Sequence, residues 1–379
     1  MRFVERCGES VNNPSMRLTG LLIFLTLGLA LAAQARAQPV EAAAAYGAHE
    51  GEFVIRDFHF RSGESLPALK LHYMTLGSPR RDASGAVTNA VLILHGTGGS
   101  GKQFLAPQFA GELYGPGQPL DVRRYFIILP DDIGHGASSK PSDGLRMRFP
   151  RYGYGDMVEA EHALVTRGLG VAHLRLIMGT SMGCMHAFLW GEAWPRAMDA
   201  LMPLACLPVQ IAGRNRLWRA MVVDAIESDP TWKAGDYAAE PLEGLRAADE
   251  FLAIAGSAPA QMQKAMPTAA DSEAYLKTSL ARSLAGLDAN DLIYQVQSSR
   301  DYDPSAELEK IVAPVMWINS ADDFINPPEL GIAQREAPRL AHGQFVLLPI
   351  SALTHGHGTH TWAAAWKDHL EALLAQSER

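Results

Sequence analysis

The sequence predicts an α/β protein built on a mostly parallel, doubly wound sheet. Two continuous apolar runs, 90–94 and 125–129, are typical of central parallel strands that are buried on both faces. Between and after them lie segments with a helical spacing of apolar residues, such as 156–168. Because strand and helix alternate along the chain, we expect right-handed crossovers that place helices on both faces of the sheet.

The other elements of the core are expected in the following order. Short strands at 53–55 and 58–60 come first, and the alternating pattern of 69–74 is typical of an edge strand. A further buried strand leads directly into Ser181. Two more buried strands and a closing helix complete the chain, at 315–318, 345–348 and 361–376.

The strand pattern stops between residues 207 and 302. This stretch is rich in Ala, Met and Leu, has helical character and is interrupted by prolines. We expect it to form a helical cap over the active site, which would shape the substrate pocket and exclude water. The predicted core is therefore made of two parts, residues 38–206 and 303–379, with the cap 207–302 between them.

Residues 1–37 have the pattern of a secretory signal peptide. Arg17 precedes a short apolar stretch, 18–33, and the segment ends in Ala35-Arg36-Ala37, a small-x-small cleavage pattern. The apolar stretch is shorter than the roughly 20 residues of a membrane span. We therefore expect cleavage near Ala37 and a periplasmic or secreted protein, with an uncleaved signal anchor as the alternative.

The net charge limits the kinds of binding partner that we expect, and the number of cysteines limits the disulfides that can form. The formal net charge is −8, and it becomes about −10 without the leader, which carries four Arg and two acidic residues. An acidic surface argues against nucleic acid or an anionic membrane as partner. Cys184 and Cys206 remain after cleavage of the leader. We expect Cys184 to be a small buried hydrophobe and not half of a disulfide.

The most informative motif is Gly179-Thr180-Ser181-Met182-Gly183, directly after an apolar run. A serine between two glycines on a sharp turn from strand to helix is the nucleophile elbow of the α/β-hydrolase fold. The turn exposes the serine Oγ above the sheet and places the backbone N–H of Met182 where an oxyanion would form. Ser181 is therefore the candidate nucleophile.

An acyl-transfer site also needs a carboxylate and a base, which follow the serine in this fold in that order. Asp322 and Asp323 come directly after a late strand, and we favour Asp323 because it stands four residues before Pro327. Asp322 is then expected to face solvent or the next helix. After the last strand, His357 lies between two glycines and is the expected base, with His355 in reserve.

The second oxyanion donor is expected in the loop after the strand that ends at Leu94. There His95-Gly96-Thr97 resembles an HG-x-type loop, which makes the N–H of Thr97 the candidate donor. The segment 96–103 is also one residue away from a phosphate-binding P-loop, but Gln103 replaces the hydroxyl residue that would bind magnesium. We reject the nucleotide interpretation for this reason.

Two further motifs could suggest other chemistry. The string His355-x-His357-x-x-His360 could suit zinc, but zinc would leave the serine and the aspartate without a function. The turn 131–138, which contains Asp132 and His135, is expected to brace the loop beside the elbow. We therefore expect neither a metal nor a cofactor.

With these motifs in place, the chain from about residue 90 onward resembles the homoserine O-acetyltransferase-like branch of the α/β hydrolases. The resemblance rests on the elbow, on the cap segment with Asp229-Pro230-Thr231-Trp232, and on the acid loop Asp323-Phe324-Ile325-Asn326-Pro327-Pro328. It implies the same triad of Ser181, Asp323 and His357. Family members carry an arginine in the cap that helps to hold the amino-acid acceptor, whereas Val223 occupies that position here. The nearby Arg214, Arg216 and Arg219 could replace it only if the helix were shifted.

The expected function is an exported serine hydrolase that cleaves an ester or related acyl bond through a Ser-Asp-His triad and an acyl-enzyme. Water is the abundant acceptor outside the cytoplasm, where acetyl-CoA has no obvious supply. An O-acyltransferase of the homoserine O-acetyltransferase type, with the same triad, is the alternative. The expected partner is a small-molecule acyl substrate, with no membrane span after signal cleavage and a homodimer as a possible assembly.

Overall fold

The computed structural model describes residues 46–378, so the expected signal peptide and its cleavage site lie outside the described residues. One sheet has the strand order β1-β2-β4-β3-β5-β6-β7-β8. The strands β3 to β8 run parallel to one another, and β1 and β2 join antiparallel at one side. The prediction of a mostly parallel sheet is confirmed. The strands are β1 His49–His59, β2 Ser65–Leu76, β3 Ala90–Leu94, β4 Phe126–Pro130, β5 Leu176–Thr180, β6 Leu201–Leu204, β7 Val315–Ser320 and β8 Gly343–Leu348.

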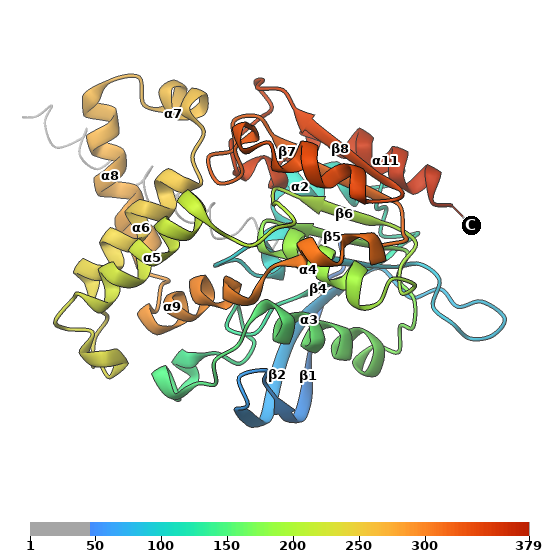
Figure 1. Ribbon diagram of the computed structural model, residues 1–379, viewed down its shortest axis with the longest axis horizontal. Coiled ribbons are helices and arrows are strands. Elements are labelled where there is room, and N and C mark those ends of the chain that lie inside the picture. Colours follow the sequence, from blue (N-terminus) through green and yellow to red (C-terminus); the bar gives the residue numbers. More distant parts are fainter. Residues whose placement is uncertain (1–45, 379) are drawn as a thin grey trace, which may run out of the picture.

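Helices cover both faces of this sheet (Figure 1). The helices α3 (Tyr154–Ala163) and α4 (Met182–Ala193) pack on one face, and α2 (Pro107–Leu113) and α11 (Lys367–Gln376) pack on the other. All residues of β3, β4 and β5 are buried. Burial on both faces explains why these strands are apolar without alternation.

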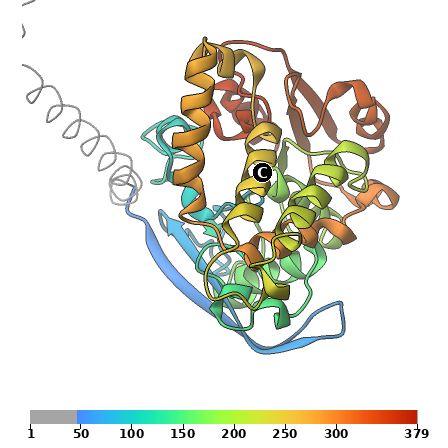
Figure 2. The ribbon, with the colours of Figure 1, turned by 90° about the vertical axis from the view of Figure 1, so that its left-hand side faces the viewer.

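A group of helices lies to one side of the sheet, at the left of Figure 1. Seen from that side in Figure 2, α6 and α8 stand in front of the rest of the molecule. Apolar side chains of α5, α6 and α9, among them Val222, Leu245 and Ile293, form a core of their own. Among the described residues, no helix is both long and apolar enough to cross a membrane. The helices of this group are α5 Gly213–Glu227, α6 Leu242–Ala255, α7 Pro259–Ala265, α8 Ala269–Leu284 and α9 Ala289–Gln297.

The structure differs from the predicted elements in four places. The two short strands expected at 53–55 and 58–60 are one strand, β1, which continues through Asp57 at φ 50°. The segment 69–74 is not an edge strand, because β1 pairs along its outer side. The strand β6 was not predicted, since it has only four residues. The last helix begins at Lys367 and not near 361, because two 3₁₀ turns precede it.

The expectation that Cys184 is unpaired is wrong, because Cys184 and Cys206 form a disulfide. Cys184 lies in the first turn of α4, directly after β5, and Cys206 lies just after the neighbouring strand β6. Parallel neighbours end at the same edge of the sheet, which brings the two Cα atoms to 5.8 Å. The bond therefore joins the helix that follows Ser181 to the chain that leads into α5.

We expect the Cys184→Ala/Cys206→Ala variant to lose about 3 kcal/mol of unfolding free energy, since the bond closes a loop across a sequence separation of 22. Denaturant unfolding followed by tryptophan fluorescence measures the loss. Addition of a reductant should have no further effect on the variant. Equal unfolding midpoints for the variant and the oxidised protein would show that the bond adds no stability.

Candidate active site

The elbow serine lies between the end of β5 and the first residue of α4. Ser181 has φ 55° and ψ −107°, a conformation that residues with a side chain rarely adopt. A Cβ at Gly179 would lie 1.9 Å from the carbonyl oxygen of Gly183, and a Cβ at Gly183 would lie 2.1 Å from that of Leu94. The two glycines are thus required by the close approach of backbone segments, and the tight turn presents Oγ above the sheet.

The structure brings Ser181, His357 and Asp323 into one hydrogen-bonded chain. The distance from His357 Nε2 to Ser181 Oγ is 2.8 Å, and that from Nδ1 to Asp323 Oδ2 is 2.9 Å. Asp323 follows β7 and His357 follows β8, so the three groups meet at the carboxyl edge of the parallel strands. All three are buried, with exposed fractions of 8% for Ser181 and His357 and 2% for Asp323.

Asp323 is held as an acceptor by several donors. Its Oδ1 accepts from the backbone N–H groups of Ile325 and Asn326, at 2.7 and 3.1 Å. Burial by itself raises the pKa of Asp323, but the neighbouring His357 and the hydrogen bonds from His357 and Asn326 outweigh it and lower the pKa below the ordinary value. Asp323 therefore stays ionised beside the imidazole.

The other candidates for the acid and the base lie elsewhere. Asp322 is half-buried, so the expected exposure to solvent is only partial, and its Oδ2 accepts from the N–H of Gly356 at 3.1 Å and so holds the His357 loop. The ring of His355 stacks on that of Trp362, with centroids 3.8 Å apart. His360 lies edge-on to His357, and desolvation lowers its pKa to about 3.

The loop that carries Thr97 packs against the elbow. A Cβ at Gly96 would lie 3.3 Å from the Cβ of Ser181, so the backbone of this loop runs beside the serine. The His95 ring holds the loop, because Nδ1 lies 2.8 Å from the carbonyl oxygen of Gly96 and Nε2 accepts the N–H of Asp132 at 3.1 Å. The N–H of Gly183 donates to the carbonyl oxygen of His95. The Thr97 loop and the first turn of α4, which begins at Met182, are therefore fixed to each other.

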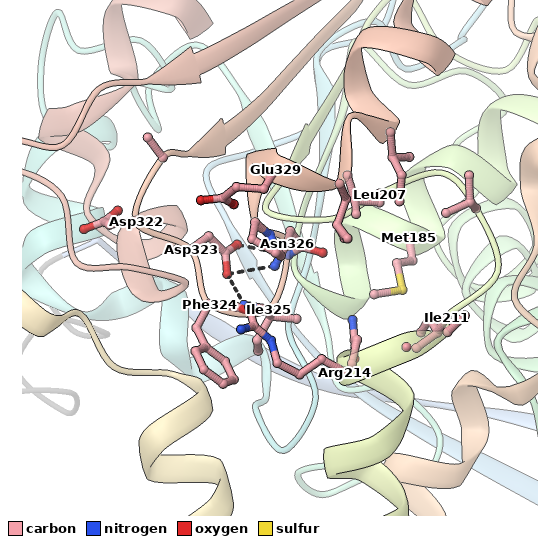
Figure 3. Close-up of a pocket in the computed structure, with 18 of the residues that line it drawn as sticks. Met185, Leu207, Ile211, Arg214, Asp322, Asp323, Phe324, Ile325, Asn326 and Glu329 are labelled. Atoms are coloured by element: carbon pink, nitrogen blue, oxygen red, sulfur yellow. Dashed lines mark hydrogen bonds between the residues drawn. The ribbon is translucent and has the colours of Figure 1, made fainter.

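Sequence reasoning missed Asn326. Its Nδ2 donates to Asp323 Oδ2 at 3.0 Å, and the two side chains lie side by side in Figure 3. The same Nδ2 donates to the carbonyl oxygen of Ala205 at 2.9 Å, next to the disulfide. It thus fixes the carboxylate that orients His357. The sequence pattern that could have indicated this role is the position of Asn326, three residues after Asp323 and directly before two prolines.

A cavity of about 840 Å³ lies between the acid loop and the helices beside the sheet. Its volume lies within the range of roughly 300–1,000 Å³ that suits a small molecule. Figure 3 shows Met185 of α4 and Ile211 on one side and the acid loop on the other. Most of the lining is apolar. The guanidinium of Arg214 lies 3.9 Å from the centroid of the Phe324 ring and adds a positive charge to the wall.

The other two arginines near the position of Val223 differ in their partners: among the described residues, the buried Nη1 of Arg216 has no hydrogen-bond partner, whereas Arg219 has neutral ones. Arg219 is buried and donates to the side chains of Asn215 and Ser299, at 3.0 and 3.3 Å. Burial lowers the pKa of Arg216, and the positive charges of Arg300 and Arg219 add to the effect. The helix α5 therefore carries positive charge close to the cavity at Arg214, Arg216 and Arg219, and not at the position of Val223.

The chain is similar to several proteins of known family or known structure. The family model described as "alpha/beta hydrolase fold" matches residues 89–347. The homoserine O-acetyltransferase of Thermobifida fusca is 30% identical over 303 residues, which are 70% of this chain and 78% of that protein. A probable acyltransferase of Methanothermobacter thermautotrophicus is 28% identical over 279 residues, 73% and 84% of the two chains. The solved acetylester hydrolase from Corynebacterium glutamicum has a TM-score of 0.76 at 20% identity, covering 88% of this chain and 97% of its own.

Proposed function

The chain belongs to the α/β-hydrolase fold family, in its homoserine O-acetyltransferase-like branch, and on this premise we propose that it is an exported serine hydrolase that cleaves an ester or related acyl bond. The observation that carries the proposal is the hydrogen-bonded chain from Ser181 through His357 to Asp323. Such a chain activates a serine hydroxyl, which by itself is a weak nucleophile.

The proposed reaction has two steps. His357 takes the Ser181 proton while Oγ attacks the substrate carbonyl, and Asp323 stabilises the imidazolium that forms. The N–H groups of Thr97 and Met182 stabilise the oxyanion, and the loss of one such donor typically costs about 10²–10³ in rate. His357 then protonates the leaving group, and the acyl-enzyme is cleaved by water that His357 deprotonates.

We assign the core to residues 38–206 and 303–379 and the cap to 207–302. The cavity beside Met185 and Phe324, between these two parts, is the proposed site for the apolar portion of the substrate. A substrate that fills this partly open cavity would exclude much of the water from it while the acyl-enzyme forms. The acceptor water then has to enter after the leaving group has departed.

Three observations support export and water as the acceptor. The leader pattern in residues 1–37 is that of a secretory signal, and the disulfide between Cys184 and Cys206 is of a kind that persists in oxidising compartments. Outside the cytoplasm water is the abundant acceptor. The absence of the family's cap arginine at Val223 also argues against an amino-acid acceptor.

Acyl transfer to an alcohol is the second candidate, and the names of the two acyltransferase relatives favour it. The two functions share the triad and differ only in the acceptor. We expect the purified protein to release the chromophore of a p-nitrophenyl ester in buffer alone, with an equal amount of free acid. Homoserine and other small alcohols should leave this release unchanged. Chromophore release that requires the alcohol, with an acylated alcohol as the product, would favour the transferase.

A further inference from the structure

A group of ionisable side chains lies behind the nucleophile helix and takes no part in the proposed reaction. Asp132 follows β4, Glu161 lies on α3 and His186 lies on α4, and their exposed fractions are 1%, 1% and 0%. One ligand atom from each lies within 4.8 Å of the others. Three segments that are distant in the sequence, the loop after β4, α3 and α4, thus contribute to one buried polar cluster.

The hydrogen bonds within this group are incomplete. His186 Nδ1 lies 2.7 Å from Glu161 Oε1, and Trp190 Nε1 donates to Glu161 Oε2 at 2.6 Å. Within the described residues, no donor group is hydrogen-bonded to either carboxylate oxygen of Asp132, which faces the carboxylate of Glu161. Its Oδ2 lies 3.6 Å from His95 Nε2 and 3.7 Å from His186 Nδ1. A buried acceptor of this kind is costly unless something is bound to it.

Two carboxylates, from Asp132 and Glu161, share this enclosed group, and among the residues that the structure describes no donor group is hydrogen-bonded to that of Asp132. A proton or a cation must therefore lie between them. One proton neutralises one carboxylate, whereas a divalent cation neutralises both.

We propose that Asp132, Glu161 and His186 form a structural site for a divalent cation of the zinc type, which joins α3 and α4 to the loop after β4. Zinc accepts one imidazole nitrogen and two carboxylate oxygens at about 2.0–2.2 Å, which places neighbouring ligand atoms roughly 3–3.5 Å apart. The observed 2.7 and 3.7 Å lie on either side of this range. A buried water completes the tetrahedron, and Trp190 orients Glu161 from outside the ligand set.

This site goes beyond the proposed reaction and departs from the sequence-based expectation that the chain holds no metal. It does not contact the substrate. Its effect is on the support of the active site, because the N–H of Asp132 donates to the same His95 ring that holds the Thr97 loop. The cation would therefore stabilise the packing of α4 against that loop.

The test measures metal content and spectra, which do not depend on catalysis. Because the site is enclosed, the full mature chain is produced in minimal medium supplemented with zinc or with cobalt. We expect about one zinc per chain by elemental analysis. The cobalt form should show the visible ligand-field bands of four-coordinate Co²⁺. The Ser181→Ala protein should give the same result, which separates this test from that of the proposed hydrolysis.

Three variants define the ligands. Glu161→Gln keeps the shape of the side chain and should lose the metal. Trp190→Phe removes the hydrogen bond to Glu161, together with part of a fully buried ring, and should weaken zinc binding by about 10–100-fold. Glu192→Gln, a partly buried carboxyl on the same helix, is the matched control and should keep the full metal content.

Wild-type protein without stoichiometric zinc or cobalt from either medium would overturn the proposal, and protons would then neutralise the carboxylates. Metal that remains at full content in both Glu161→Gln and Trp190→Phe would overturn it as well, since the ion would be bound elsewhere. If Glu161→Gln fails to fold, competition with a chelator decides between these outcomes, because Trp190→Phe should lose its metal at a lower chelator concentration than Glu192→Gln.

Discussion

Ser181→Ala is expected to lower kcat for a chromogenic ester by about 10⁶-fold, the loss typical of removing a triad nucleophile. The methyl group cannot form the acyl-enzyme, while the oxyanion donors and the substrate cavity remain. Alanine keeps the Cβ that the unusual backbone conformation already accommodates, so the fold should be unchanged. Steady-state kinetics on an ester panel measure the effect.

The control for this variant is structural. Its unfolding temperature and its Cys184–Cys206 disulfide should match those of the parent protein. Ser272→Ala, which alters an exposed serine on α8, should keep full activity. Turnover by the Ser181→Ala protein at the rate of the parent protein would show that Ser181 is not the nucleophile.

Asp323→Asn is expected to lower kcat by about 10⁴-fold. An amide in place of the carboxylate cannot stabilise the imidazolium of His357, and it favours the wrong tautomer of the ring. It also places a second amide opposite Asn326, which donates to the native carboxylate. The same ester kinetics measure this loss.

Asp322→Asn is the matched control, because Asp322 precedes Asp323 and contacts the His357 loop without contacting the imidazole in the described hydrogen bonds. Most of the activity should remain in this variant, since an amide oxygen can still accept the N–H of Gly356. A larger loss in Asp322→Asn than in Asp323→Asn would reverse the assignment of the acid.

The parts of the structure that depend on local pattern could be predicted from the sequence. The central strands were recognisable because burial on both faces makes them continuously apolar, as in 90–94. The elbow was recognisable because close backbone contacts require Gly179 and Gly183. Asp323 and His357 followed from the order of the chain, and the structure places both within hydrogen-bond distance of their expected partners.

The features that depend on contacts between distant segments could not be predicted. The pairing of Cys184 with Cys206 depends on the position of β6, a strand too short to recognise. The role of Asn326 depends on the carbonyl group of Ala205, more than a hundred residues away. Asp132 was expected only to brace a loop, because nothing in the sequence indicates that Glu161 and His186 lie beside it.

The central claim is that Ser181 is the nucleophile, activated by His357. A fluorophosphonate that reacts with activated serines, followed by peptide mass spectrometry of the mature protein, tests this claim most directly. The account predicts a single adduct on the peptide that contains Ser181, absent from Ser181→Ala and formed far more slowly in His357→Ala. An adduct on another serine, or equal labelling of the parent and Ser181→Ala proteins, would contradict it.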